Sequence, residues 1–265
     1  MIYKSEEEVV LIGESAMLAS KTLAYLASIL KPGTTTLDLD RYANTFIQNH
    51  QAVPSFYQHN GFPANICTSV NEVVVHGLPN NNPLKEGDVV SIDIGVYKNG
   101  FHGDQAYTFI LGEASEEAMH LVKTTKESLA KGIEKAVHGN RIGDISYAIQ
   151  SHVEQYGYGV VKELVGHGLG KRLHETPPEI PNYGKQGQGK LLNENLVIAI
   201  EPMINLGTAN VYTARDKWTI RTADGKVSAH FEHDVCIKKG TALVLTDFNL
   251  IEKEEKNNPN LNSLI

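Results

Sequence analysis

Two stretches of the sequence each run an apolar strand into a carboxylate. The segments 89–93 and 197–201 read Val-Val-Ser-Ile-Asp and Val-Ile-Ala-Ile-Glu, which places Asp93 and Glu201 at the ends of runs typical of buried strands. A carboxylate there must be paired, neutralised or bound to a cation, because a bare charge in an apolar medium is costly. Acids at matching points of two similar segments indicate a metal ion held between two halves.

Other landmarks recur with the same offset of roughly one hundred residues. A His-Gly pair precedes each acidic strand, with His76 in the first copy and His167 in the Gly-rich segment 166–170 in the second. Each copy reads as helices, then His-Gly, then acidic strands. These copies are too long for solenoid repeats, so we interpret them as an internal duplication.

The first acidic strand permits a geometric prediction. Asn99-Gly100 separates two strand patterns and is a strong signal for a two-residue hairpin turn. That turn places Gly95 opposite Asp104, with Asp93 diagonal to Asp104 on the same face. Diagonal neighbours lie about 7 to 8 Å apart, close enough for two carboxylates to share or bridge cations. Gly95 is expected to leave room on that face for the acids and an ion.

The second half supplies donors of the same kind, namely Glu201 before Pro202, Glu232 in the segment 230–234, and His167. With Asp93 and Asp104 they make one imidazole and four carboxylates, which offset the charge of two divalent ions. Such oxygen-dominated sites favour manganese, iron or cobalt, and zinc and magnesium are compatible with the ligand types.

Taken singly, each of these residues has a simpler interpretation. Asp93 could cap a turn or lie on an edge strand, and Asp104 could follow a bulge at Gly103. Glu201 and Glu232 could face solvent, and His167 could be a loop histidine with its hydrogen bonds satisfied. The repeat and the hairpin geometry together favour the metal site.

The elements that must position these residues alternate between helix and strand. The apolar spacing predicts four helices and four strands: helices from Ser5 to about Leu30, through residues 39–47, from about Ser115 to Ala136 and from about Asp144 to Gly157, and strands at 89–97, 101–111, 196–200 and 229–237. The tail from Glu252 is polar and is predicted to be solvated and disordered.

Composition excludes several classes of protein. The chain has 265 residues, a net charge of −7 and no cluster of Lys and Arg, which argues against a nucleic-acid surface. Its acidic N-terminus is unlike a signal peptide, and no apolar run approaches the length of a membrane span. Two distant cysteines, Cys67 and Cys236, argue against a disulfide framework and favour a reducing cytoplasm.

Seven segments of the sequence together resemble a known family. From about residue 2 to 248 the chain resembles the type I methionine aminopeptidases, which have the pita-bread metallopeptidase fold. The matching segments, in order, are 71–77, 91–95, 100–104, 166–170 with His174-Glu175, 181–184, 200–203 and 231–233. Only 33 residues lie between His167 and Glu201, which leaves no room for the helical insertion of the type II enzymes.

The resemblance implies an α+β pita-bread fold, with two pseudo-symmetric halves, a curved antiparallel sheet and helices outside. We expect one catalytic domain over residues 1–250, with halves at about 1–111 and 112–250, and a polar tail over 251–265.

The resemblance further implies a dinuclear centre with Asp93, Asp104, His167, Glu201 and Glu232 as ligands, of which Asp104 and Glu232 bridge. A metal-bridging hydroxide would attack the carbonyl of an initiator methionine. Glu201 would also receive a proton, His174 would stabilise the oxyanion, and His76 would contact the scissile amide or leaving amine. For the two histidines a packing role is the simpler alternative.

The methionine pocket is implied only in part. Phe62, Cys67 and Trp218 match positions that line an apolar slot, and Phe56 and His59 occupy pocket positions where other residue types are common. Two further departures from the family pattern are Leu173, where an aromatic residue is common, and Asp234, where Thr is usual. For Trp218 a plain core role is an equal alternative.

The implied substrates are peptides and nascent chains that begin with methionine, with a small second residue preferred. The ribosome is a candidate partner, and a cytoplasmic monomer is expected.

Two rival functions have weaker support. The segment 184–190 imitates a phosphate-binding loop but has Leu191 where Ser or Thr is needed and follows no strand. A non-catalytic binding protein of the same fold would be expected to have lost ligands, and all five are present.

Overall fold

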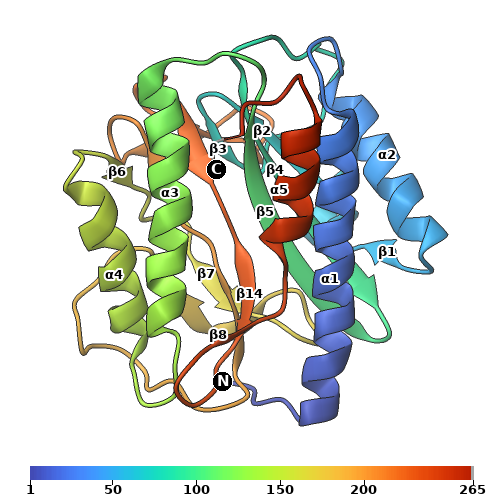
Figure 1. Cartoon of the computed structure of the whole chain (residues 1–265). Coiled ribbons are helices and arrows are strands. Elements are labelled where there is room, and N and C mark those ends of the chain that lie inside the picture. Colours follow the sequence, from blue (N-terminus) through green and yellow to red (C-terminus); the bar gives the residue numbers. More distant parts are fainter. Residues whose placement is uncertain (264–265) are drawn as a thin grey trace.

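The computed structural model describes residues 1–263, and helices cover one face of its sheets (Figure 1). There are five α-helices in this part of the chain: α1 Glu6–Ile29, α2 Thr36–Asn49, α3 Glu116–Lys135, α4 Ile142–Glu154 and α5 Phe248–Asn257, with a short 3-10 turn at His59–Gly61. Helices α1 and α2 belong to the first half of the chain, and α3 and α4 to the second.

The strands pair antiparallel throughout the described chain. The first half contributes β1 Val53–Pro54, β2 Cys67–Val70, β3 Val73–Val75, β4 Val89–Lys98 and β5 Phe101–Ile110. The second half contributes β6 Gly159–Val160, β7 Gly166–Gly168, β8 Glu175–Ile180, β9 Val197–Ile200, β10 Met203–Asn205, β11 Val211–Thr213, β12 Ile220–Thr222, β13 Ser228–His230, β14 His233–Cys236 and β15 Leu243–Val244.

Two larger sheets position the candidate ligands. In one, the long strand β4 pairs with β5 along one side and with β1 and β2 along the other. The other has the order β15-β14-β9-β7-β8. Two three-stranded sheets, β13-β10-β6 and β11-β12-β3, complete the structure. The α+β architecture with antiparallel sheets and external helices is the predicted one.

The hairpin register is confirmed. Lys98 pairs with Phe101 and Gly95 with Asp104, so the loop is Asn99-Gly100, and both loop residues have positive φ, 51° and 87°. The expectation that Gly95 leaves open space is wrong, because a Cβ at Gly95 would lie 2.6 Å from the ring of Phe56. The missing side chain makes room for Phe56.

Helix α1 begins with the predicted capping box, in which the Ser5 side chain and the Glu8 backbone meet. Contrary to the prediction about apolar runs, α1 is long and apolar enough to cross a membrane by length and composition, but most of that apolar stretch is buried in the fold. Its neighbours explain its composition, since α1 packs against β4 and β5 on one side and against α5 on another. A helix enclosed in this way is apolar around most of its circumference.

The C-terminal segment differs from the prediction of a solvated, disordered tail. Residues 248–257 form α5, which lies beside α1 (Figure 1), and Ile251 is fully buried. Beyond the helix, the Asn258 amide donates to the carbonyl oxygens of Ala27 and Leu30. Residues 264–265 of the predicted tail lie outside the described part of the chain.

The predicted strand over 229–237 is divided. It breaks into β13 and β14 around Phe231 and Glu232, which removes these two residues from the regular ladder.

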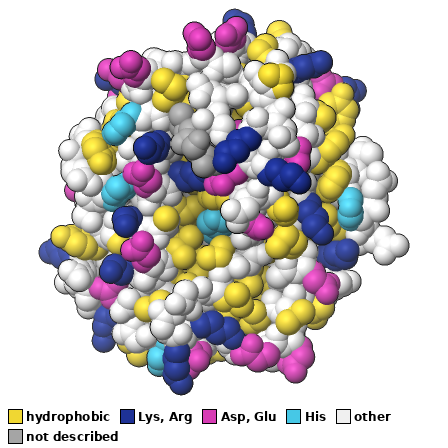
Figure 2. All heavy atoms as spheres, viewed as in Figure 1, with side chains coloured by type: hydrophobic (Ala, Val, Ile, Leu, Met, Phe, Trp, Pro, Cys, Tyr) yellow, Lys and Arg dark blue, Asp and Glu magenta, His cyan; other side chains and the backbone are white. Residues whose placement is uncertain are grey.

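On the face that the helices cover, acidic and basic side chains are interspersed among the described residues (Figure 2). That face offers no surface of one sign to attract nucleic acid.

Candidate active site

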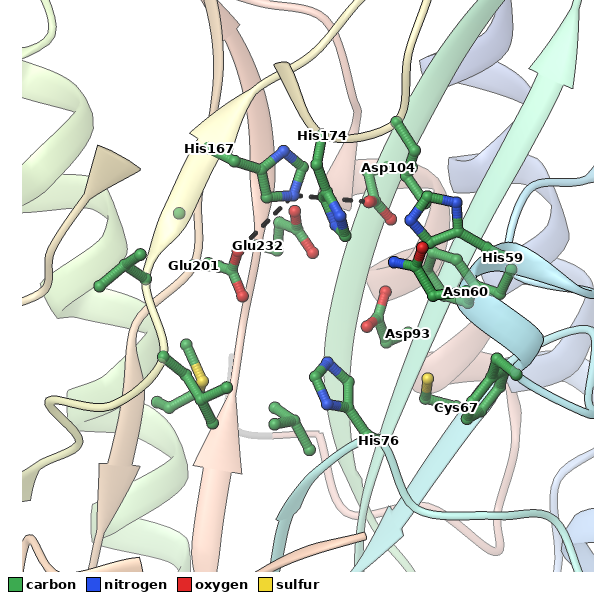
Figure 3. Close-up of a pocket in the computed structure, with 18 of the residues that line it drawn as sticks. His59, Asn60, Cys67, His76, Asp93, Asp104, His167, His174, Glu201 and Glu232 are labelled. Carbon is green, nitrogen blue, oxygen red and sulfur yellow. Dashed lines mark ion pairs between the residues drawn. The ribbon is translucent and has the colours of Figure 1, made fainter. Parts of the chain in front are cut away.

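A cleft of about 440 Å³ brings the predicted site residues together (Figure 3). Its walls come from β4 and β5 on one side and from β7, β9 and the β13–β14 break on the other. Its lining includes every residue that the sequence assigned to the site: Phe56, His59, Phe62, Cys67, His76, Asp93, Asp104, His167, His174, Glu201, Trp218 and Glu232.

Three of the five proposed ligands form a compact group. Donor atoms of Asp104, His167 and Glu232 all lie within 4.8 Å of one another, and all three residues are buried. The His167 Nε2 atom is 4.0 Å from Asp104 Oδ2 and 3.7 Å from Glu201 Oε1. Asp93 comes from β4 beside Asp104, diagonal to it as the register requires.

The strand that carries His167 is held close to its neighbours by glycine. A Cβ at Gly166 would lie 2.3 Å from the Ala199 carbonyl oxygen of β9. The His167 Nδ1 atom is 3.0 Å from the Gly168 carbonyl oxygen, and a donor role for Nδ1 leaves Nε2 as an acceptor facing the acids. A histidine held in this way presents a metal-ligating nitrogen.

The carboxylates at the centre lack hydrogen-bond partners for some of their buried oxygens. One oxygen each of Asp93, Asp104 and Glu232 is buried and has no hydrogen-bond partner among the described residues. Burial first, and then the charge of Glu201, raises the pKa of Asp104 to about 7. Burial raises the pKa of Glu201 to about 8, and burial with the neighbouring acids raises the pKa of Asp93 and Glu232 well above their usual range.

Divalent cations fit this donor set. The unpaired oxygens of three acids and a free imidazole nitrogen face one space, and cations there would offset the repulsion and the cost of burial that raise these pKa values. Oxygen-rich ligands with one imidazole suit manganese, iron, cobalt and zinc.

His76 and His174 project into the cleft from opposite sides of the acids (Figure 3). Burial first, and then nearby histidines, lowers the pKa of each ring to about 4, so both are neutral at pH 7 and each carries one N–H. His76 follows β3 with a positive φ of 56°. The next residue, Gly77, lets the chain pass close to β2, since a Cβ there would lie 2.1 Å from the Thr68 carbonyl oxygen.

The apolar end of the cleft is a separate cluster. Phe56, Phe62, Cys67 and Leu173 pack together, with Trp218 against them. The Phe62 and Trp218 rings meet edge to face at 5.2 Å between centroids. This cluster forms an apolar slot beside the acids, and the His59 ring stands near its mouth, 5.1 Å from that of His174.

Asp234, which departs from the family pattern, lies beside the proposed ligand Asp104. Its side chain is fully buried, its Oδ2 accepts the backbone N–H of Asp104 at 2.7 Å, and its Oδ1 has no partner in the described structure. Burial and the neighbouring Asp104 raise its pKa well above the usual range. Asp234 thus adds a carboxylate to the four proposed acidic ligands, and it contacts the backbone of one of them, Asp104.

Sequence reasoning missed two residues that contact Glu201. His230 is 1% exposed, and its Nε2 lies 3.6 Å from Glu201 Oε2. Asn182 donates its side-chain N–H to the Glu201 backbone oxygen at 2.9 Å. The position of His230 two residues before Glu232 was the available signal, whereas nothing in the sequence places Asn182 beside Glu201.

Comparisons with known proteins show the family of the chain. Residues 11–239 match the model of metallopeptidase family M24. The chain is 49% identical over 247 residues to a methionine aminopeptidase of Clostridium acetobutylicum, covering 93% of this chain and 98% of the relative. It is 45% identical over 246 residues to methionine aminopeptidase 1 of Bacillus subtilis, covering 93% of this chain and 99% of the relative.

Solved structures show the same relationship. The methionine aminopeptidase of Rickettsia prowazekii superposes with a TM-score of 0.91 at 38% identity, covering 93% of this chain and 100% of the other. An Xaa-Pro dipeptidase of Bacillus anthracis superposes with a TM-score of 0.75 at 19% identity, covering 92% of this chain and 62% of the other, which shows the shared fold alone. The chain therefore belongs to metallopeptidase family M24, among the type I methionine aminopeptidases.

Proposed function

We propose that this chain removes the initiator methionine from nascent proteins and peptides by metal-dependent hydrolysis, with a preference for a small second residue. The observation that carries the proposal is the juxtaposition, in one cleft, of a buried acid–histidine group and an apolar slot. The names of the relatives support the choice of methionine.

Asp93, Asp104, His167, Glu201 and Glu232 would together hold two divalent ions. Such ions, when bound, supply Lewis acidity and lower the pKa of the attacking water. The same acids face the end of the slot, where the free α-amine of the substrate would lie. That arrangement limits cleavage to the first residue of a chain.

The residues of the chain have distinct proposed tasks. The slot of Phe62, Cys67 and Trp218 would bind the thioether side chain. The neutral His174 would donate its N–H to the oxyanion, and His76 would contact the scissile amide from the other wall. Glu201 would receive the proton of the attacking water at a carboxylate oxygen, while Asn182 holds its backbone oxygen.

The preference for a small second residue has geometric support. The rings of His59 and His174 both line the cleft, 5.1 Å apart between centroids, and we expect them to limit the space for the second residue. We also propose a cytoplasmic location, which two buried cysteine thiols support.

The test is release of free methionine from Met-Ala-Ser and Met-Leu-Ser by chelated protein refilled with single metals. We expect release from Met-Ala-Ser only after manganese, iron, cobalt or zinc is added, and much less from Met-Leu-Ser. Lys-Ala-Ser is the control, because an unpaired ammonium in the apolar slot would be costly. Efficient release of lysine, or full activity of the chelated protein, would refute the assignment.

A further inference from the structure

The His174 ring has little to hold it in place. It lines the cleft with part of its surface open to solvent, and no hydrogen bond to the ring occurs within residues 1–263, although the rings of His167 and His59 lie 4.2 Å and 5.1 Å away between centroids. It belongs to the loop between β7 and β8. Its position must therefore come from its chain neighbours, Leu173 and Glu175, which are both buried.

Leu173 supplies one anchor, because it packs in the apolar cluster of the slot. Glu175 supplies another through its carboxylate. One oxygen accepts the backbone N–H of Lys171 at 3.0 Å, which closes the loop on itself. The other oxygen pairs with the ammonium of Lys4, and both side chains are nearly inaccessible to solvent.

Lys4 lies in the short segment before α1, far from the loop in sequence. Its backbone N–H donates to the Asn195 carbonyl oxygen at 2.8 Å, so the segment is fixed to the second half of the molecule. The ion pair is packed tightly against the loop, since a Cβ at Gly170 would lie 2.5 Å from Lys4 Nζ and 2.7 Å from Glu175 Oε1. Gly170 is itself tied to β5, because its carbonyl oxygen accepts the His102 N–H at 2.8 Å.

We propose that Lys4 is a positioning residue for the reaction, which fixes the His174 loop through the buried ion pair with Glu175. This inference rests on the role proposed for His174. The N-terminal segment thereby contributes to the active site without contacting the substrate. Removal of one partner of such a buried pair leaves an uncompensated charge, whereas removal of both partners does not.

The experiment distinguishes an effect on the position of the His174 loop from an effect on the stability of the protein. Lys4→Met alone leaves the Glu175 carboxylate buried and bare, and the protein is expected to lose stability. The double variant Lys4→Met/Glu175→Gln contains no buried charge, and its Tm is expected to return to near the wild-type value. Lys238→Met is the matched control, because Lys238 ties Glu6 of the N-terminal region to the body of the protein at 2.8 Å but does not contact the His174 loop.

Each variant, loaded with zinc, is assayed for methionine release from Met-Ala-Ser, for zinc content and for the NMR resonance of the His174 ring, assigned with His174→Ala. We expect the double variant to retain zinc, to keep KM within about twofold of wild type and to lose about tenfold or more in kcat, because a misplaced donor lowers the rate of the chemical step. Its His174 resonance should shift or broaden. Lys238→Met should match the wild type in all of these measurements.

The inference is overturned if the double variant keeps both the wild-type kcat and the wild-type His174 resonance. Loss of zinc would also overturn it, because the pair would then support the metal centre. A wild-type protein that releases no methionine would refute the proposed function instead. The His174 resonance would then decide the positioning role by itself.

Discussion

Asp104 is the residue at which the two halves of the molecule meet. Its side chain lies with His167 and Glu232 of the second half, and its backbone N–H donates to Asp234 of β14. A second backbone hydrogen bond joins the halves nearby, because the Glu232 N–H donates to the Ala106 carbonyl oxygen of β5 at 3.0 Å. The acids of the centre are thus brought together by contacts between strands far apart in the sequence.

Substitution of either proposed bridging acid should abolish activity. Asp104→Asn or Glu232→Gln removes one charge from the centre while leaving the side-chain volume almost unchanged, and we expect methionine release to fall below detection in either variant. Glu116→Gln, on the exposed surface of α3, is the control. Full activity in either bridging variant would contradict a dinuclear centre.

His174→Ala should lower kcat by about a hundredfold or more, the loss typical of one transition-state donor. Metal content should stay at the wild-type level, since His174 is outside the proposed ligand set. Stopped assays over a range of Met-Ala-Ser concentrations separate kcat from KM. A change confined to KM, or a loss of metal, would reassign His174 to substrate binding or to structure.

Asp234→Asn should weaken metal binding. Asn keeps an acceptor for the Asp104 N–H and removes a buried negative charge close to the proposed cations. We expect the dissociation constant for Mn²⁺ to rise about tenfold, which corresponds to about 1.4 kcal/mol. Calorimetric titration measures this directly. An unchanged dissociation constant would show that Asp234 acts only through its hydrogen bond.

At the scale of elements, α5 completes the packing behind the site. It lies against α1, and the Tyr107 hydroxyl of β5 donates to its buried Glu255 at 3.0 Å. The rings of Phe248 and Phe231 both pack against Tyr107. Phe231 immediately precedes Glu232, so the C-terminal helix supports the backbone that carries a proposed ligand.

Ile251→Ala should therefore destabilise the fold by about 2 to 5 kcal/mol, because it leaves a cavity at a fully buried side chain. Lys253→Ala, on the exposed side of the same helix, controls for helix propensity and should have little effect. Urea unfolding measures both. Equal stabilities of the two variants would show that α5 is dispensable for folding.

At the scale of the whole molecule, the buried acids couple stability to pH. Asp104 and Glu201 have pKa values of about 7 and 8 in the folded chain, far above their usual values, so the native state binds more protons than the unfolded state below these values. The site histidines oppose this at lower pH, since burial lowers the pKa of His167 from 6.5 to about 3. Unfolded histidine, with a pKa near 6.5, is mostly neutral only above about pH 7, and from there upward the acids decide the slope.

We therefore expect the free energy of unfolding of the chelated protein to fall as pH rises from about 7 to 8. Saturating Mn²⁺ should reverse this trend, because cation binding favours the deprotonated acids of the native state. Urea unfolding at several pH values, with and without metal, provides the comparison. Chelated protein whose stability rises over this interval would contradict the burial of unpaired acids.

Features that depend on local pattern along the chain are predictable from the sequence. The Asn99-Gly100 turn fixes the register of β4 against β5, and period-two alternation then places Asp93 and Asp104 on one face. The capping box at Ser5 and the apolar spacing that follows it predict α1. The repeated acidic strands predicted a metal site between two halves, because a carboxylate in an apolar run needs a partner wherever the strand is placed.

Contacts between side chains far apart in the sequence come from the tertiary structure. Phe56 packs against Gly95, where the local pattern suggested open space. The polar tail forms a helix because Ile251 is buried in the core and Asn258 hydrogen-bonds to the end of α1. The tertiary structure also sets His230 and Asn182 beside Glu201, and Lys4 beside Glu175. Such contacts follow from how sheets and helices pack, and a pattern along the chain carries no information about the distance between residues that packing brings together.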